Sequence, residues 1–464
     1  MHKRPRHRYS RAPATRTRYL PARSTCQPHL YCRWRAEVDS GKARVRLTHR
    51  LTGALTAATV LNLSALVSMQ SAGALPTITS GTTTGHWVQA AELAGSGGVP
   101  DFGASIAISG GVVVVGAPGG TIRPGGSYYS GPSKRGRAYV FTKGANGWHQ
   151  TAELTGSDTV LGDNFGYSVA VSDDTVVVGA YSAFSGSGRA YVFTKGANGW
   201  HQTAELRGSD TGPGDSFGYS VAVSGSTVVV GAPYSGGVTE GGSAGRAYVF
   251  TNGANGWHQA AELTGPAPTT SQLCMLPGDE FGNSVAVSGE TAVVGACGQA
   301  MAGRAYVFTK GPNGWHQTAD LKGSDTARDD GFGWSVALSG GTAVVGAPGH
   351  ARRAGRVYVF TNDGTGWYQV AELAGQHFFG GLVAVSGGTI VASTQGSPAP
   401  VDVFTKGATG WLDSRLVRSH SAAGELLKSS VAVSGDMIGV GAELAGIART
   451  GPGYGLAYLF KYLD

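Results

Sequence analysis

Charged residues and cysteines are scarce in this chain. Only 14% of its 464 residues are charged and only four are cysteine, whereas an average soluble domain is about 25% charged. Phosphate-binding loops, paired zinc-ligand motifs and the H-E-x-x-H sequence are missing, and no apolar period of 3.6 residues marks long helices. These absences argue against a P-loop nucleotide site, a zinc protease of the H-E-x-x-H type and a helical solenoid.

Positive charge is also missing from most of the chain. Residues 1–50 hold 14 of the 36 Lys and Arg residues and two of the 29 acidic residues, a balance of +12. Residues 51–464 therefore hold 22 basic and 27 acidic residues, a balance of −5. Since a nucleic-acid groove needs clustered positive charge, we expect no nucleic-acid partner, and we interpret residues 1–50 as a disordered basic leader.

A long uncharged, largely apolar segment directly follows the basic leader. Residues 51–71 carry no charge, basic residues precede them, and Ala72-Gly73-Ala74 ends the segment. This pattern predicts that residues 51–74 are the apolar region of a signal peptide cleaved after Ala74, or a signal anchor that is retained. Fifty residues exceed an ordinary n-region, so translation from a later start is a further alternative. We expect a secreted or cell-surface protein, with membrane contact only through such an anchor.

Glycine, in contrast, is abundant, and it marks an internal repeat. The chain has 76 glycines, about one residue in six, where roughly 7% is usual. The pair Phe-Gly recurs at intervals of 47 to 64 residues and begins six copies, at residues 102, 165, 217, 281, 332 and 379. A seventh copy lacks the pair and begins at Ser429. The seven copies fill residues 95–464 and indicate a repeat architecture.

Each copy contains four strand-like runs. The third copy reads FGYSVAVSG, TVVVGAP, GRAYVF and GWHQAAEL, with short Gly-containing turns between the first two and between the last two. Four antiparallel strands repeated seven times predict an all-β, seven-bladed β-propeller over residues 85–464. The segment GHWVQAAELAG at residues 85–95 matches the fourth run, which the last copy lacks. We therefore expect this N-terminal strand to complete the last blade and close the ring.

Two short motifs resemble a known family. Phe-Gly at the start of a copy and Gly-Ala-Pro after its second run, as at Gly116–Pro118, Gly231–Pro233 and Gly346–Pro348, resemble FG-GAP repeats, the blades of the integrin α-subunit propeller. The resemblance covers about 380 residues. It implies a seven-bladed propeller, usually extracellular, that binds other macromolecules or surfaces.

Calcium is not carried over from that resemblance. Many integrin-type blades hold calcium in a D-x-D-x-D-G turn, because the ion needs six to eight oxygen ligands. Here the corresponding turns are short, and their only acidic residues are Asp173, Asp174, Glu290 and Asp436. Calcium is possible for the family, but we expect neither a cofactor nor a metal here.

Several polar and aromatic residues recur in nearly every copy, and we interpret them as structural. The aspartates before Phe-Gly are predicted to cap backbone N–H groups, and the arginines that open the third run are predicted to pair with nearby aspartates. The histidines of GWHQ are predicted to stand apart on different blades, either in solvent or packed on tryptophan, and the tryptophans are predicted to pack between blades. These residues are Asp163, Asp215, Asp279 and Asp330; Arg137, Arg189, Arg246, Arg304 and Arg356; His149, His201, His258 and His316; and Trp87, Trp148, Trp200, Trp257, Trp315, Trp367 and Trp411.

The connections from second to third run and from fourth to first run differ between copies. In an antiparallel blade both emerge on the same side, where binding residues are usually found. The opposite interpretation, that nothing constrains these loops, is equally open. The candidate binding residues on these loops are Arg123, Tyr128, Tyr129, Lys134, Arg135, Tyr181, Phe184, Tyr234, His350, Arg352, Arg353 and Tyr454.

Two of the four cysteines lie in the repeats. Cys274 precedes the first run of the fourth copy and Cys297 follows its second run. Because these runs form a hairpin, both residues are expected on the loop side, and we predict a Cys274–Cys297 disulfide.

These observations predict a secreted or cell-surface, monomeric propeller that acts as a non-enzymatic binding or adhesion module, with no catalytic residues. The expected partner is a protein or a glycan. Two alternatives stay open: the propeller domain of an extracellular hydrolase or lyase, and a structural surface or matrix component. An enzyme would gather acids, histidine or a nucleophile from several blades at one end of the axis.

Overall fold

A computed structural model of the chain describes residues 85–119, 134–236, 243–266, 278–394, 401–408, 410–416, 430–442 and 455–463. The leader and the export segment predicted at residues 1–50 and 51–74 lie outside this part. Within it, no helix has the length and apolar character needed to cross a membrane.

The first three repeats follow one pattern of four strands. Repeat 1 contains β2 (Ser105–Ser109), β3 (Val112–Ala117), β4 (Arg137–Gly144) and β5 (Gly147–Leu154). Repeat 2 contains β6 (Ser168–Ser172), β7 (Thr175–Ala180), α1 (Ala183–Gly186), β8 (Arg189–Gly196) and β9 (Gly199–Leu206). Repeat 3 contains β10 (Ser220–Ser224), β11 (Thr227–Ala232), β12 (Ser243–Gly253) and β13 (Gly256–Leu263).

The remaining repeats keep the pattern, with the last one completed from the N-terminus. Repeat 4 contains β14 (Gly278–Ser288), β15 (Thr291–Ala296), η1 (Gln299–Met301), β16 (Arg304–Gly311) and β17 (Gly314–Leu321). Repeat 5 contains β18 (Ser335–Ser339), β19 (Thr342–Ala347), α2 (His350–Arg353), β20 (Arg356–Asn362) and β21 (Trp367–Ala374). Repeat 6 contains β22 (Leu382–Ser386), β23 (Thr389–Ser393), β24 (Val401–Lys406) and β25 (Trp411–Arg415). Repeat 7 contains β26 (Ser430–Ser434), β27 (Met437–Ala442) and β28 (Leu456–Leu463), and β1 (His86–Leu93) pairs with β28.

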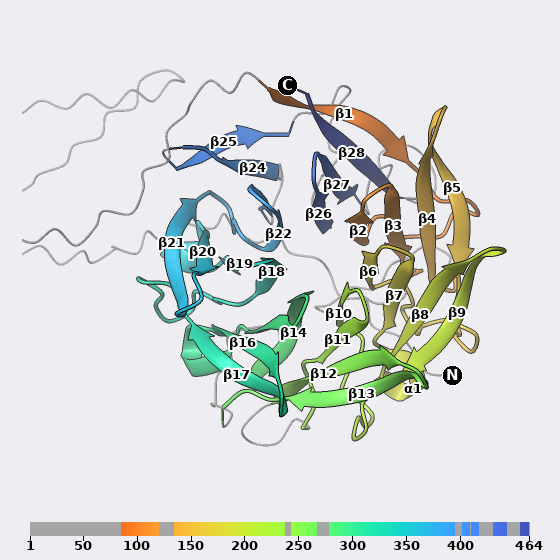
Figure 1. Cartoon of the computed structure of the whole chain (residues 1–464), viewed down its shortest axis with the longest axis horizontal. Coiled ribbons are helices and arrows are strands. Elements are labelled where there is room, and N and C mark those ends of the chain that lie inside the picture. The colour runs from red at the N-terminus through yellow and green to blue at the C-terminus, as the bar shows by residue number, and fades with distance from the viewer. Residues whose placement is uncertain are drawn as a thin grey trace, which may run out of the picture. The chain divides into compact units, whose positions relative to one another are not determined.

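The strands form antiparallel sheets in which sequence neighbours are also hydrogen-bonded neighbours. Repeats 3 and 4 share one eight-stranded sheet because β12 and β14 are linked by a short parallel pairing at Ser243↔Gly278 and Gly245↔Phe281. Figure 1 shows the sheets around a common centre, with the first strand of each repeat innermost. The predicted all-β fold of four-stranded antiparallel sheets, arranged as in a β-propeller, is confirmed.

The apolar pattern of each strand matches its burial. The second strand of repeat 1 is Val-rich and buried beyond its first residue; Val113, Val114 and Val115 each have 0% exposure. The fourth strands alternate between exposed and covered residues, as in GWHQTAEL of β5. A strand enclosed on both faces favours a continuous apolar run, and one with a solvent face favours alternation.

The turns between the first and second strands are joined by a series of hydrogen bonds. The last Ser of a first strand accepts a hydrogen bond from a backbone N–H in the corresponding turn of the next repeat, at 3.0 to 3.4 Å. The series returns to its start, because Ser434 of repeat 7 accepts from Gly110 of repeat 1. The acceptor and donor pairs are Ser109–Asp173, Ser172–Gly225, Ser224–Gly289, Ser288–Gly340, Ser339–Gly387, Ser386–Gly435 and Ser434–Gly110.

The glycines of the two sequence motifs face each other between neighbouring repeats. A Cβ on Gly179, in Gly-Ala-Tyr of repeat 2, would overlap the carbonyl oxygen of Gly218, in Phe-Gly of repeat 3. Gly218 has a φ of 90°, which side chains other than glycine rarely allow. The same contact joins Gly441 of repeat 7 to Gly103 of repeat 1. Both motifs therefore require glycine because backbones approach closely there.

Apolar side chains from adjacent repeats form the core. Each hydrophobic cluster combines two neighbouring repeats and has one of the seven recurrent tryptophans packed against it or included in it. Trp411 is buried at 7% exposure. The predicted packing of these tryptophans between repeats is confirmed.

Candidate functional site

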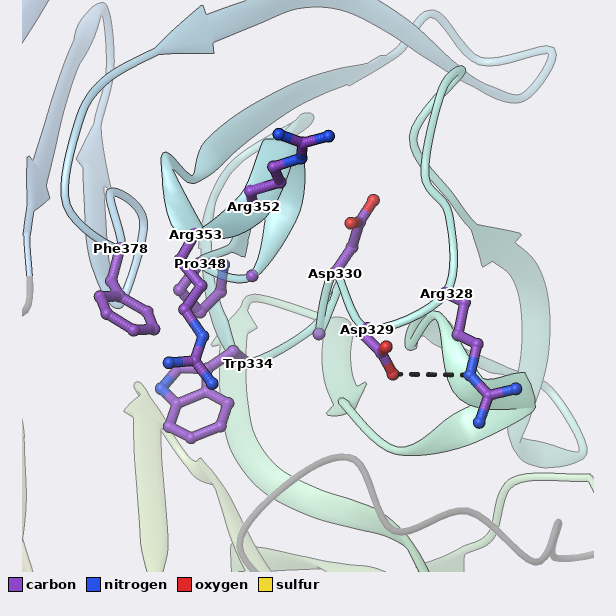
Figure 2. Close-up of a pocket in the computed structure, with 10 residues that line it drawn as sticks. Arg328, Asp329, Asp330, Trp334, Pro348, Arg352, Arg353 and Phe378 are labelled. Atoms are coloured by element: carbon purple, nitrogen blue, oxygen red, sulfur yellow. Dashed lines mark ion pairs between the residues drawn. The ribbon is translucent and has the colours of Figure 1, made fainter. Parts of the chain in front are cut away.

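The connections between strands lie on two sides of the sheets. We call the side with the Ser-Gly turns the turn side. The loop side carries the connections from second to third and from fourth to first strand. On the loop side, three of these connections enclose the cavity shown in Figure 2.

The cavity has a volume of about 550 Å³ and belongs mainly to repeat 5. The β17–β18 connection contributes Arg328 and Trp334, the β19–β20 connection contributes Arg352 and Arg353, and the β21–β22 connection contributes Phe378. Three arginines and two aromatic side chains therefore line this concave surface together with Asp329 and Asp330. Arginine beside aromatic rings suits anionic or flat polar groups.

The arginines at this cavity are exposed and differ in their contacts. The Arg353 guanidinium lies 5.3 Å from the ring centroid of Phe378, within reach of a cation–π interaction. Arg328 Nε lies 3.7 Å from Asp329 Oδ1, an exposed ion pair. Figure 2 shows the Arg353 side chain beside Trp334 and Phe378, with Arg352 above them.

The turn that carries two of these arginines has an unusual backbone. Ala351, Arg352 and Arg353 have φ values of 50°, 59° and 72°, in the left-handed region. Such conformations cost on the order of 1–3 kcal/mol each and persist only where surrounding contacts enforce them. Backbone hydrogen bonds supply these contacts: Arg353 N donates to Gly349 O at 2.9 Å, and Phe378 N donates to Arg353 O at 2.7 Å. Corresponding turns contain Phe184 and Ser185 in repeat 2, and Ala300 and Met301 in repeat 4, also with positive φ.

His350 lies beneath this turn, 9% exposed. Its Nδ1 is 2.8 Å from Oδ2 of Asp330, which is 5% exposed. Its Nε2 is 3.4 Å from Oδ2 of Asp325. Glu372 offers a further carboxylate oxygen within 4.8 Å of the ligand atoms of Asp325 and His350.

A cluster of four tyrosines occupies the loop side of repeats 2 and 3. Tyr167 lies 4.5 Å from Tyr181 and 5.2 Å from Tyr219, and Tyr219 lies 5.9 Å from Tyr234, all between ring centroids. Burial raises the pKa of Tyr181, Tyr219 and Tyr234 above the ordinary tyrosine value. The hydroxyls are therefore neutral hydrogen-bonding groups at physiological pH.

The candidate binding residues from the sequence lie in several different places. Arg352 and Arg353 line the cavity, His350 is buried in the same short helix, α2, and Tyr181 and Tyr234 join the tyrosine cluster. Phe184, 50% exposed, stacks with the Arg189 guanidinium at 4.1 Å. Outside the described residues lie Arg123, Tyr128, Tyr129 and Tyr454.

Two further candidates, Lys134 and Arg135, and Cys297 of the predicted cysteine pair do not line the cavity. Lys134 Nζ donates to Gly97 O at 2.7 Å, and Arg135 is exposed. Cys297 directly follows β15 and is 1% exposed. Cys274 lies outside the part of the chain that the structure describes, so the Cys274–Cys297 disulfide stays a prediction.

The recurrent aspartates cap backbone groups as expected. Asp163 Oδ2 accepts from Val160 N at 2.7 Å, Asp215 Oδ2 from Gly212 N at 2.8 Å, and Asp330 Oδ2 from Ala327 N at 2.7 Å. The prediction is thus confirmed for these three aspartates, each of which closes its fourth-to-first connection.

The recurrent arginines have different partners from those expected. Each pairs with the acidic residue near the end of its own fourth strand, and Arg246 also reaches an aspartate of the Gly-Ser-Asp motif, Asp210, at 3.6 Å. Adjacent strands bring the two side chains together across one face, which sequence spacing could not show. The pairs are Arg137–Glu153, Arg189–Glu205, Arg246–Glu262, Arg304–Asp320 and Arg356–Glu372.

The histidines of GWHQ are exposed and lie on separate fourth strands, as expected. Sequence reasoning missed Trp334 and Phe378, which line the cavity. A usable signal was present: the residue after Phe-Gly varies between copies, and it is Trp334 in repeat 5 and Tyr167 and Tyr219 in repeats 2 and 3.

The fold and the loop-side geometry define a class: an all-β repeat protein with sheets arranged as in a propeller. Comparison with protein families then finds the FG-GAP repeat at residues 148–193, 200–250, 275–308 and 315–360. The chain therefore contains FG-GAP repeats within residues 148–360.

Two further comparisons were made. A search of curated proteins returned no match. Among solved structures, the chain is similar to Sqt1 of Chaetomium thermophilum, with a TM-score of 0.44 and 17% sequence identity, over 76% of this chain and 82% of that chain.

Proposed function

We propose that the chain is an exported, monomeric, seven-bladed β-propeller that acts as a non-enzymatic binding module for a macromolecular partner at a cell surface. The returning series of seven Ser hydrogen bonds supports seven blades. The pairing of β1 with β28 and the contact between Gly441 and Gly103 support closure of the ring by the N-terminal strand.

The cavity of repeat 5 carries the functional part of the proposal. It is built from variable connections on a uniform scaffold, which is how binding sites are usually arranged. Arg352 and Arg353 can pair with carboxylate or sulfate groups, and Trp334 can stack on a sugar ring. We therefore propose an acidic glycan as the partner.

The test applies the labelled full chain to an array of sulfated, carboxylated and neutral glycans. We expect binding to acidic glycans, and a loss of at least about tenfold in the double variant Arg352→Gln/Arg353→Gln, since each charged hydrogen bond contributes about 1.5–3 kcal/mol.

The matched control is Lys143→Gln/Lys195→Gln, which removes two exposed cations from the turn side. This control should bind as the unaltered chain does. If both double variants lose the same affinity, the loss is due to net charge and not to the cavity. Absence of binding to any acidic glycan would contradict the proposed partner. Shortening of the glycans during the assay would contradict a non-enzymatic role and favour the hydrolase or lyase alternative.

A further inference from the structure

Repeat 5 differs from repeats 2 and 3 at one position beside a group of polar residues that all three share. Repeats 2, 3 and 5 share the aspartate of Gly-Ser-Asp, the aspartate before Phe-Gly, the tyrosine of the third strand and the glutamate of the fourth. In repeat 5 these are Asp325, Asp330, Tyr358 and Glu372. The third residue after Ala347 of Gly-Ala-Pro is His350; the corresponding residues are Ala183, Ser235 and Gln299 in repeats 2, 3 and 4. A nitrogen ligand is thereby placed among carboxylates in this repeat.

We propose that Asp325, His350 and Glu372 bind a Zn²⁺-type transition-metal ion. One ligand atom from each residue lies within 4.8 Å of the others. His350 Nε2 and Asp325 Oδ2 are 3.4 Å apart, and two ligands of a tetrahedral zinc ion at about 2.0–2.1 Å are separated by about 3.3–3.4 Å. The two atoms are therefore already at the spacing that coordination requires.

The atoms of these residues that point away from the site are held by other groups. His350 Nδ1 is bonded to the buried Asp330, which fixes the ring and leaves Nε2 for a ligand. Tyr358 Oη donates to Asp325 Oδ1 at 2.7 Å. Arg356 Nε donates to Glu372 Oε1 at 2.6 Å, which holds that carboxylate in place. A carboxylate behind a ligating imidazole is the usual outer-shell arrangement of zinc sites.

A direct ion pair explains the contact between His350 and Asp325 less well. Charge-assisted N–H···O hydrogen bonds are about 2.7–2.9 Å long, whereas the contact between His350 Nε2 and Asp325 Oδ2 is 3.4 Å. One imidazole with two carboxylates suits zinc and related ions, while calcium prefers a larger set of oxygen atoms. With Asp325 47% exposed on its side chain, solvent can complete the coordination.

The experiment measures Zn²⁺ bound to the full chain by equilibrium dialysis, and the visible absorption of bound Co²⁺ as a spectroscopic signature. Cys26→Ser/Cys32→Ser is the background, because Cys26, His29 and Cys32 could bind metal independently. In that background we expect one site that His350→Gln abolishes, together with the Co²⁺ bands. Repeat 4 carries Gln299 at this position, so the glutamine is compatible with the fold.

Matched variants separate coordination from structure. Glu372→Gln and Glu205→Gln each remove the partner of a third-strand arginine, but only Glu372→Gln should weaken Zn²⁺ binding. Asp330→Asn should weaken it about 10- to 100-fold, whereas Asp215→Asn, the corresponding change in repeat 3, should not. Circular dichroism without metal checks that each variant is folded. The proposal is wrong if His350→Gln retains the site, or if the background protein binds no Zn²⁺ at micromolar concentration.

Discussion

The turn side and the loop side of the sheets are built from the same repeats but on different principles. On the turn side every repeat presents a short turn, Ser-Gly in all but repeat 2, where it is Ser172-Asp173, and its serine contacts the next repeat in the same way, from Ser109 through Ser434. On the loop side the backbones meet at glycines, and tyrosine hydroxyls hold connections that otherwise differ. The turn side therefore has the same contacts in every repeat, whereas on the loop side the connections differ in sequence while the glycine and tyrosine contacts recur.

The largest expected difference between the two sides concerns glycine. Gly218 on the loop side has a φ of 90°, and a Cβ there would overlap Arg189 O; Gly225 on the turn side has a φ of 54° and open space around it. We expect Gly218→Ala to lower the free energy of unfolding by at least about 3 kcal/mol, and Gly225→Ala by about 1 kcal/mol. Chemical denaturation measures the free energy of unfolding of both variants. Equal losses would contradict the expected difference between the loop side and the turn side.

High pH should act on the loop side. Burial raises the pKa of Tyr191, Tyr248 and Tyr358, and their hydroxyls donate to Asp158, Asp210 and Asp325. Because the folded pKa exceeds the unfolded value near 10, the stabilisation is complete below pH 10 and decreases as pH rises above it.

Tyrosinate absorbance at alkaline pH, recorded with far-ultraviolet circular dichroism, checks this expectation. Ionisation of the buried tyrosines should coincide with loss of structure. The variant Tyr191→Phe cannot ionise at that position. Its unfolding transition should therefore lie at higher pH than that of the unaltered chain, once the difference in their stability at neutral pH is taken into account. Complete tyrosine ionisation without structural change would contradict the role assigned to these hydroxyls.

The smallest expected effect concerns a single hydrogen bond of the turn side. Ser172 Oγ accepts from Gly225 N at 3.1 Å in an exposed turn. Removing one such bond by Ser172→Ala should cost about 0.5–1.5 kcal/mol. Thermal denaturation measures the change. Ser216→Ala on the loop side is not a suitable control, because Ser216 has a positive φ. A loss above about 3 kcal/mol would mean that the turn-side series acts as a cooperative unit.

Much of the fold could be predicted from local pattern. The period of Phe-Gly located the repeats, and the alternation in GWHQTAEL against the solid run in TVVVGA distinguished exposed from enclosed strands. These signals are readable because side-chain periodicity follows directly from strand geometry and burial. The pairing of residues 86–93 with the last strand was also predictable, because the missing fourth run had one matching segment.

The partners of charged side chains could not be predicted in this way. Arg356 was expected to pair with an aspartate but contacts Glu372, which is 16 residues away on the adjacent strand, opposite Tyr358. Which residues meet at the cavity was also hidden, since Trp334, Arg353 and Phe378 come from three connections. Their proximity depends on how repeat 5 packs against the next repeat.

The amino-acid pattern was sufficient for the repeat, the strand types and the positions that demand glycine, because each depends on neighbours along one strand or one turn. Tertiary structure decided which side chains share a surface. His350 illustrates the division: the sequence shows a histidine where other repeats have alanine, serine or glutamine, but only the packing of three chain segments places it between Asp325, Asp330 and Glu372. Long-range contacts of this kind arise from the packing of the sheets, and local sequence carries no record of them.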